Sequence, residues 1–507
     1  MSQPQGPPQR RYQRLDTDEE IENLEDYEPG GYHPVDLFDI LDSRFEVVYK
    51  LGFGGIAMVW LCYEFDAERW RAVKINAASH SSENCSELKM LQTMKNNSVT
   101  PEQLDAMHIV VPLETFWIDG PNGRHLCSVM PVLGPRLSKW REDLALDYDT
   151  VGKMCYQFTE GLGFLHEMGI AHGDFRPANI LTKLKPQSLD SISVDEMKEL
   201  LDAPEYEEVI TLDGEPSIHA PEDVVTGVRW HRLRHLVSDD IAIVDFGESY
   251  RPGDPPSSLG IPRQYAAPEV VFGGTPTIMS DIWSLAYTLL EFRLGTSLMT
   301  TIPAIVWHME GFAGPIPHEY RSAAIEIVGK VTGKHLLSHI EDSPTSKDQS
   351  LGPITENLKT LNDMKKGLAK GTDYSDLLEI TLGGKYWVTV SQPTEKDGLW
   401  CPGDTGLHRL PSHDVILFAD LLRGMFKYHP EDRRGVSEAL NHPWFRRNRE
   451  DPDKLTRIRS SYLPSISLVG LCLLLPWLVW TLVKISPHQS MSSNGPDICI
   501  LTRYILV

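Results

Sequence analysis

The hydrophobic positions of the chain divide it into a strand-rich part and a helix-rich part. Short runs rich in β-branched and aromatic residues lie between residues 45 and 75 and predict strands of an antiparallel sheet: FEVVYKLG, MVWLCYEF and WRAVKI. The apolar positions that follow are spaced three apart and predict one face of a helix over Glu83–Met94. After Gly134 the pattern is helical, first around Tyr156–His166 and again over Ser280–Phe292.

This order of elements predicts an α+β fold with two lobes. The small lobe, residues 45–133, should hold the antiparallel sheet and one main helix, and the large lobe, residues 134–447, should be largely helical. Within the large lobe, residues 182–240 are acidic and interrupted by Pro and Gly, which predicts a partly ordered insertion. Residues 1–35 combine Pro, Gln and an acidic run, and we expect them to form a flexible arm.

A hydrophobic segment near the C-terminus stands apart from both lobes. Residues 462–484 include the run ISLVGLCLLLPWLVW, which is long and apolar enough to cross the ~30 Å hydrocarbon core of a bilayer. Arg457 and Arg459 precede this run and Lys484 ends it, as is common at membrane interfaces. We therefore expect a membrane anchor that leaves both lobes in the cytosol, followed by a tail over residues 485–507. The alternative is an apolar helix docked on the lobes.

Charge and cysteine content narrow the class of partner and the compartment. A formal net charge of -23 argues against direct nucleic-acid binding, because phosphate backbones are held by clustered Lys and Arg. It favours a basic protein substrate, although solubility explains the charge equally well. The 7 cysteines are odd in number and far apart, which predicts a reducing compartment, the cytoplasm or the nucleus. A monomer is the default expectation.

A glycine-rich turn joins the first two predicted strands. In LGFGGIAMV, the residues Gly52, Gly54 and Gly55 allow backbone N–H groups to approach phosphates where a Cβ would obstruct them. An ordinary hairpin has a similar composition. Ala57 also stands where nucleotide-binding loops of this type have a third glycine.

One lysine lies within an apolar predicted strand, in the sequence Ala72-Val73-Lys74-Ile75. A buried ammonium needs a carboxylate partner, and Glu87 on the following helix is suitable, with Glu83 as the alternative. Such a Lys–Glu pair holds the ammonium toward the α- and β-phosphates of ATP. A surface lysine that extends its head group to water is the other interpretation.

The segment HGDFRPAN, residues 172–179, matches the catalytic loop pattern H-x-D-x-x-x-x-N. Phosphoryl transfer requires an acceptor for the substrate hydroxyl proton and a metal ligand, which Asp174 and Asn179 supply. Arg176 can place positive charge near the γ-phosphate. Asp245 of VDFG follows a β run and can coordinate Mg²⁺. The candidates are therefore catalytic Asp174, Arg176, Lys74 and Glu87, metal-binding Asn179 and Asp245, and the cofactors ATP and Mg²⁺.

Further carboxylates follow in the expected order. Glu269 of APE should become buried, and Arg433 is the predicted partner because an unpaired buried carboxylate is costly. Asp281, at the start of the second predicted helical run, should accept hydrogen bonds from the backbone of the catalytic loop. A plain helix N-terminal charge is the alternative for Asp281.

These motifs resemble those of eukaryotic protein kinases over residues 45–447. Several stretches are similar to the serine/arginine-rich (SR) protein kinases: GGYHPV, GFGG with MVWL, HLCSVMPVLG, GLGFLHEMGIAHGDFRPANIL and RQYAAPEV. The resemblance implies a Ser/Thr protein kinase whose protein substrates are rich in Arg and Ser. It also implies a nucleotide pocket lined by Leu51, Gly52, Gly54, Gly55, Val59, Ala72, Lys74, Met130, Val132 and Leu133.

The chain departs from the kinase pattern at a few positions. Gly173 replaces the arginine that pairs with a phosphorylated activation loop, so control by loop phosphorylation is not expected. Pro262 stands where serine/threonine kinases usually have a threonine near the catalytic Asp. Ala266 replaces the arginine that is typical of the substrate-side loop. These departures keep open a kinase-shaped binding protein without activity. A small-molecule phosphotransferase shares the HGD loop but lacks the APE segment and the helix after it.

Overall fold

The computed structural model describes residues 10–15, 21–139, 146–201, 203–230, 232–295, 302–332, 376–384, 386–389, 394–396, 399–401 and 405–447. All of these lie in one compact unit, Met1–Arg449. Among them, no helix is both long enough and apolar enough to span a bilayer. The predicted anchor over residues 462–484 and the tail after it lie outside the described residues.

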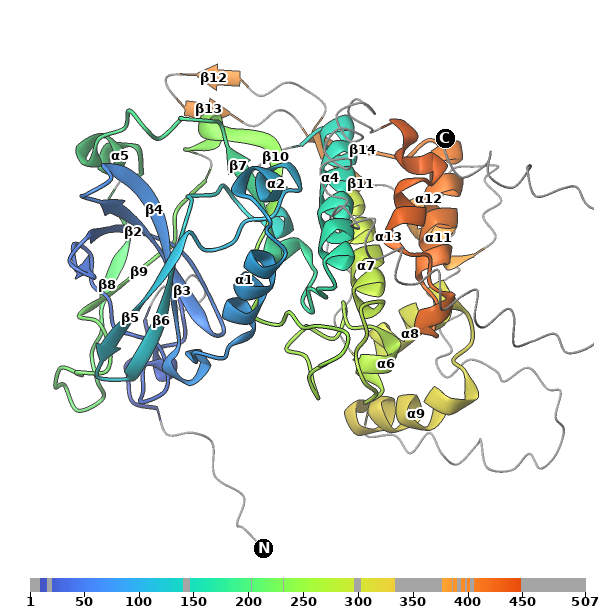
Figure 1. Cartoon of the computed structure of the whole chain (residues 1–507), viewed down its shortest axis with the longest axis horizontal. Helices are drawn as coiled ribbons and strands as arrows, with labels where there is room; N and C mark the ends of the chain where they lie inside the picture. Colours follow the sequence, from blue (N-terminus) through green and yellow to red (C-terminus); the bar gives the residue numbers. More distant parts are fainter. Residues whose placement is uncertain are drawn as a thin grey trace, which may run out of the picture. The chain divides into compact units, whose positions relative to one another are not determined.

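The N-terminal lobe is built on a 6-stranded antiparallel sheet in the order β1-β2-β3-β4-β6-β5 (Figure 1). The strands and helices of this lobe are β1 (Ile40–Leu41), β2 (Phe45–Gly54), β3 (Ala57–Glu64), β4 (Arg69–Asn76), α1 (Ser86–Asn96), α2 (Pro101–Ala106), β5 (Glu114–Gly120) and β6 (Gly123–Met130). The β2–β3 ladder shifts register after Val47 and after Lys50 and continues to the pair Gly54 and Ala57, so the glycine-rich turn closes a hairpin. The predicted strands are thus confirmed.

The main helix of this lobe, α1, begins later than the sequence predicts. The residues before it form a turn in which the hydroxyl of Ser82 accepts a hydrogen bond from the backbone N–H of Asn84 at 3.1 Å. Ser and Asn side chains compete with helix hydrogen bonding in this way. The predicted start at Glu83 was therefore wrong. Of the predicted apolar positions Leu88, Leu91 and Met94, Met94 is buried and the two leucines are half-buried, while Met90 is buried as well.

The C-terminal lobe is largely helical and packs around α7, whose residues are all buried. A helix that is apolar nearly all round belongs in a core, which explains the run SDIWSLAYTLLEF. The two-lobed α+β fold is confirmed. The helices after residue 134 are α4 (Tyr148–Glu167), α5 (Val194–Leu201), α6 (Pro268–Val271), α7 (Ser280–Leu294), α8 (Ile302–Ala313), α9 (His318–Thr332), α11 (Leu377–Leu382), α12 (Ser412–Met425) and α13 (Val436–Leu440). The strands after residue 134 are β7 (Ile180–Leu184), β8 (Tyr206–Glu208), β9 (Asp223–Val225), β10 (Val237–Ile243), β11 (Tyr386–Thr389), β12 (Thr394–Lys396), β13 (Leu399–Cys401) and β14 (Thr405–His408). Of these elements, α5, β8 and β9 belong to the insertion.

A short antiparallel pair, β7 with β10, brings two distant motifs together. Ile180 pairs with Ile243, so the residues just outside the pair also meet, and the N–H of Val244 donates to the carbonyl of Asn179 at 3.0 Å. Asn179 ends the catalytic loop and Asp245 directly follows Val244. The pairing therefore places both candidate metal ligands at the same end of one hairpin, with the insertion looping out from the other end.

The flexible arm predicted for residues 1–35 is wrong for its described part. Tyr12, Tyr27, Tyr32 and Val35 are buried and belong to the same hydrophobic cluster as side chains of β2, β3, β4 and β6. The acidic composition hid an interleaved set of aromatic and aliphatic side chains that pack on the lobe. Tyr27 is fully buried, so this segment is part of the N-lobe core.

The insertion also differs from the expectation for the C-terminal lobe. Its residues Val209, Ala220, Val224 and Val225 are buried in the N-lobe cluster, and β8 and β9 lie beside the N-terminal sheet in Figure 1. The carbonyl of Ile192, just before α5, accepts a hydrogen bond from the indole of Trp70 on β4 at 2.8 Å. Sequence reasoning placed residues 182–240 by their order in the chain, but their apolar side chains cover the N-lobe.

A buried ion pair joins these added segments to the sheet. Lys50 on β2 pairs with Glu22, and each side chain is only 1% exposed. The ammonium of Lys50 also donates to the carbonyl of Val225 in the insertion at 3.0 Å, and the hydroxyl of Tyr27 donates to the Glu22 carboxylate at 2.6 Å. Burial lowers the pKa of Lys50, and Glu22 opposes that shift. Each charge therefore depends on its partner.

We expect Lys50→Met to destabilise the N-lobe strongly. It leaves the Glu22 carboxylate buried without its cation, a change that costs about 3–5 kcal/mol of unfolding free energy in comparable pairs. The double variant Lys50→Met with Glu22→Gln keeps an acceptor for Tyr27 and should recover most of that loss. Urea unfolding followed by tryptophan fluorescence measures both.

The matched control is Lys95→Met on the exposed surface of α1. Its unfolding free energy should stay within about 0.5 kcal/mol of wild type. If Lys50→Met cost no more than Lys95→Met, the pair would not anchor the added segments.

Candidate active site

A cleft of about 480 Å³ lies between the glycine-rich turn and the catalytic loop, a size suited to a nucleotide-like ligand. Apart from their chain neighbours, no described residue has an atom within 4 Å of where a Cβ on Gly54 or Gly55 would stand. The glycine-rich turn, called the flap below, therefore leaves room for a ligand. Of the residues predicted from the sequence, those that line the cleft are Leu51, Gly52, Gly54, Gly55, Val59, Ala72, Lys74, Glu87, Met130, Leu133, Asp174, Arg176, Asn179 and Asp245.

Val132 is the predicted pocket residue that does not line this cleft. Its neighbours Pro131 and Leu133 do, as expected where successive side chains point to opposite sides of an extended chain. Pro131 has no N–H, so its backbone can only accept a hydrogen bond, through its carbonyl. Sequence reasoning missed Trp230 and Arg136, which also line the cleft. Trp230 comes from the insertion, where no local motif signals a role in the cleft.

Lys74 lies at the centre of a charge cluster at the back of the cleft. Its ammonium is 2.9 Å from Oδ1 of Asp245 and 3.8 Å from Oε1 of Glu87. Burial alone would lower the pKa of Lys74, but Asp245 and Glu87 outweigh it and raise the pKa. The predicted Lys74–Glu87 pair is thus present, and the alternative partner Glu83 instead lies 3.7 Å from Arg124 on the surface.

Asp174 sits in the catalytic loop with partners on both oxygens. The guanidinium Nε of Arg176 lies 3.0 Å from each, and the amide of Asn179 donates to Oδ2 at 2.7 Å. Burial raises the pKa of the Asp174 carboxyl, and the Arg176 cation acts in the opposite direction. The side chain can accept a proton from a group that enters the cleft once Arg176 shifts toward an incoming anion.

Asn179 and Asp245 offer oxygen ligands of the kind that Mg²⁺ prefers. The amide nitrogen of Asn179 is engaged by the carbonyl of Asp174 at 2.8 Å, which directs its amide oxygen elsewhere. Lys74 lowers the pKa of Asp245, so this carboxylate is charged at neutral pH. Asp245 has φ +65, an unusual backbone for a non-glycine residue that is often found at functional sites. These donors fit the metal that the motifs imply.

Two buried carboxylates hold the loops around the cleft. Asp281 at the start of α7 accepts the backbone N–H groups of His172 at 2.7 Å and Gly173 at 3.0 Å, as predicted. Glu269 accepts from the guanidinium of Arg433 at 2.8 Å, and both side chains are buried. Both predictions are confirmed.

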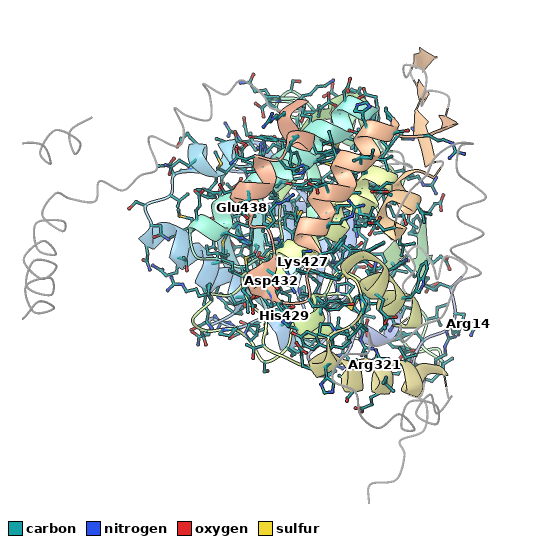
Figure 2. All side chains as sticks on the ribbon, turned by 90° about the vertical axis from the view of Figure 1, so that its right-hand side faces the viewer. Arg14, Arg321, Lys427, His429, Asp432 and Glu438 are labelled. Carbon is teal, nitrogen blue, oxygen red and sulfur yellow. The ribbon has the colours of Figure 1, made fainter. Side chains whose placement is uncertain are left out.

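Arg433 is buried although residues near it in the sequence are exposed. Lys427 and Asp432 are labelled on the face turned toward the viewer in Figure 2 and are exposed, whereas Arg433 is buried. Arg433 also donates to the carbonyls of Lys427 at 2.9 Å and Met279 at 2.8 Å. It therefore ties the end of the activation segment to the start of α7 from inside the lobe.

Gly173 cannot be replaced without moving the backbone. It has φ +81, and a Cβ at this position would stand 2.1 Å from the carbonyl oxygen of Glu248. The segment after Asp245 thus occupies the space that the side chain of an arginine would need. The Glu248 carboxylate instead accepts a hydrogen bond from the N–H of Gly260 at 2.8 Å. This bond joins two parts of the activation segment, residues 247–266.

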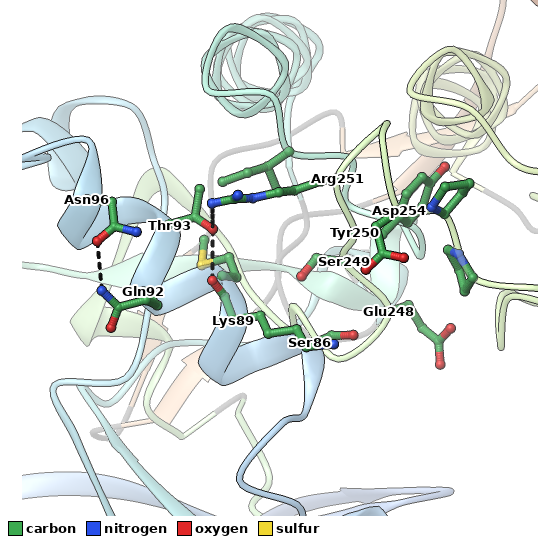
Figure 3. Close-up of a pocket in the computed structure, with 14 residues that line it drawn as sticks. Ser86, Lys89, Gln92, Thr93, Asn96, Glu248, Ser249, Tyr250, Arg251 and Asp254 are labelled. Carbon is green, nitrogen blue, oxygen red and sulfur yellow. Dashed lines mark hydrogen bonds between the residues drawn. The ribbon is translucent and has the colours of Figure 1, made fainter.

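A second hollow, of about 590 Å³, runs along α1 beside residues 248–256 (Figure 3). Arg251 crosses it and donates to the hydroxyl of Thr93 at 2.8 Å, as the dashed line in the figure shows. This bond connects α1, which carries Glu87, to the segment that follows Asp245. The bond therefore links the two elements that carry the carboxylates of the Lys74 cluster.

Comparisons with known proteins agree with this geometry. A family model described as "Protein kinase domain" matches residues 45–194. Residues 45–194 are therefore similar to a protein kinase domain. The chain also resembles the SR protein kinases, and the family resemblance inferred from the sequence is confirmed.

The relatives found for this chain are named as protein kinases. Serine/threonine-protein kinase spk-1 of Caenorhabditis elegans is 36% identical over 178 residues, 34% of this chain and 18% of that protein. SRSF protein kinase 3 of Homo sapiens is 37% identical over 170 residues, 32% of this chain and 30% of that protein. The chain thus spans less than a third of the length of these two relatives.

A longer match extends over both lobes. Serine/threonine-protein kinase SRPK of Physarum polycephalum is 26% identical over 445 residues, 84% of this chain and 92% of that protein. A crystal structure of a kinase domain covers 82% of this chain and 98% of its own, with a TM-score of 0.48 and 21% identity.

We expect Gly173→Ala to destabilise the fold more than the loss of a left-handed glycine alone would explain. A Cβ in the left-handed region costs about 1–2 kcal/mol, and the contact with Glu248 adds about 1–3 kcal/mol of strain. Urea unfolding gives the difference directly.

Gly169→Ala is the matched control, because Gly169 has φ +69 but no atom within 4 Å of its Cβ position. It should show only the left-handed penalty. Equal losses in the two variants would contradict the proposed crowding at position 173.

Proposed function

We propose that this chain is an ATP-dependent protein kinase that transfers the γ-phosphate of ATP to Ser or Thr hydroxyls of protein substrates. The proposal depends most on one observation: Lys74, Asp174, Asn179 and Asp245 face a single cleft beneath a glycine-rich flap. A cation for phosphates, a proton acceptor and oxygen ligands for a metal are the parts that phosphoryl transfer requires.

The roles of the side chains follow from their contacts. Lys74, held by Glu87, binds the α- and β-phosphates, while Leu51, Val59 and Leu133 enclose the base. Asp245 and Asn179 would hold Mg²⁺, which would neutralise charge on the phosphates. Asp174 accepts the proton of the substrate hydroxyl, and Arg176 turns from Asp174 to the transferred phosphate.

Basic, Arg/Ser-rich proteins are the proposed substrates. The net charge of -23 gives the enzyme a field that attracts cationic chains, and the printed names of the relatives include SRSF protein kinase 3. Because a hydroxyl must reach Asp174, Ser and Thr in an extended basic segment suit the cleft.

The direct test is γ-phosphate transfer from radiolabelled ATP with Mg²⁺ to an Arg/Ser-repeat peptide. We expect Asp174→Ala to lower kcat by about 10²–10⁴-fold, because the positioned proton acceptor is lost. The exposed Asp149→Ala serves as the control and should match wild type.

Each other result points to a different protein. ATP binding without turnover in wild type would indicate a kinase-shaped binding protein. Label transferred only to small acceptors would indicate a small-molecule phosphotransferase. Equal rates for wild type and Asp174→Ala would remove Asp174 from the mechanism.

The pH dependence provides a second test. Asp174 must be deprotonated to accept a proton, so kcat/KM should fall as pH drops through its pKa, which burial raises above the usual value. Arg176 lowers that pKa. In Arg176→Gln, the acidic limb of the kcat/KM profile should therefore move to higher pH, whether or not the maximal rate also falls.

The control for this profile is Arg69→Gln, an exposed arginine on β4. Its acidic limb should coincide with that of wild type. An acidic limb in Arg176→Gln that stayed in place, or moved to lower pH, would contradict the assignment of Asp174 as the titrating base.

A further inference from the structure

We propose that Tyr32, from the segment preceding the kinase domain, is a positioning residue for nucleotide phosphates. Its hydroxyl donates to the carbonyl of Gly54 at the tip of the glycine-rich flap, at 2.6 Å. This inference rests on the proposed function, because it assigns Tyr32 to the same nucleotide cleft. Residues 45–194 match the kinase family model, so Tyr32 lies outside the matched range.

Tyr32 is itself rigidly held. Its carbonyl accepts from the amide of the buried Asn122 at 2.6 Å, and its ring packs edge-on against Tyr27 with the centroids 5.7 Å apart. The carbonyls of Gly30 and Gly31 accept from Ser79 at 2.8 Å and Ala78 at 3.0 Å. These contacts fix the backbone before the tyrosine, so its hydroxyl is a stationary donor.

The flap tip needs such a donor, because two consecutive glycines impose little backbone preference of their own. In a trans peptide the carbonyl and the following N–H point in opposite directions. Holding the carbonyl of Gly54 therefore also sets the direction of the Gly55 N–H. Gly55 lines the cleft and Tyr32 does not, so that N–H is turned away from the tyrosine and kept available for a phosphate oxygen.

The rest of the turn is already held from the sheet side. The carbonyl of Ile56 accepts the N–H of Ala77, the residue after β4, at 2.8 Å. Val228 of the insertion donates to the carbonyl of Lys50 on β2 at 2.9 Å. Tyr32 thus completes the set of contacts by fixing the Gly54–Gly55 peptide, which lies over the phosphates and not over the base.

This placement predicts a selective effect. Tyr32→Phe keeps the ring and its contact with Tyr27 but removes the hydroxyl. It should weaken binding of MgATP and MgADP by about 3- to 10-fold, the range expected for one lost hydrogen bond. Binding of adenosine, which has no phosphate, should not change.

Isothermal titration of the full chain with MgATP, MgADP and adenosine measures these affinities. Tyr12→Phe is the matched control, because Tyr12 is also buried in the N-terminal segment. Its hydroxyl contacts Ser217 at 3.2 Å and the carbonyl of Tyr27 at 3.4 Å, and not the flap. It should leave all three affinities unchanged. A second variant, Asn122→Ala, releases the carbonyl of Tyr32 and should show the same selective loss as Tyr32→Phe.

Unchanged MgATP affinity in Tyr32→Phe, or an equal loss for MgATP and adenosine, would overturn the proposal while leaving the kinase assignment intact. If wild type bound no MgATP, the proposed function would fail and this inference with it. The two failures are therefore distinguishable within one set of titrations.

Discussion

The pairing of β7 with β10 is the constraint on which the site depends. It joins the end of the catalytic loop to the segment that carries Asp245, although the whole insertion lies between them in sequence. Once Val244 is bonded to Asn179, the Asp245 carboxylate lies within reach of Lys74, and its charge keeps that buried ammonium protonated. A buried ammonium without a counter-charge would be unstable, so the fold and the chemistry require the same contact.

The N-lobe is completed by two segments whose composition predicts loops, the N-terminal segment and the insertion. The N-terminal segment and the insertion cover one side of the sheet and meet through Glu22, Lys50 and Val225. From there, their contacts extend to the flap through Tyr32 and to the mouth of the cleft through Trp230. Parts outside the range matched by the family model thus shape the cleft.

The sequence predicts the elements whose signal is local. The strands around Lys74, the helix α7, the Glu269–Arg433 pair and the contact of Asp281 with the loop backbone are confirmed, because apolar periodicity and unpaired charge leave few alternatives. The catalytic roles of the loop residues stay predictions. The packing of Tyr27 and Val225 was not predictable, since acidic neighbours mask their apolar side chains and their partners are distant in sequence. Trp230 was missed for the same reason.

The central claim is that Asp174, Asn179 and Asp245 converge on one metal-bound nucleotide. A crystal soaked with Mn²⁺ and a non-hydrolysable ATP analogue tests it directly, because Mn²⁺ replaces Mg²⁺ and is located by anomalous scattering. We expect a metal peak between the Asp245 carboxylate and the amide oxygen of Asn179, with the phosphates beneath Gly54 and Gly55. A nucleotide bound elsewhere, or a metal peak away from both side chains, would contradict the account.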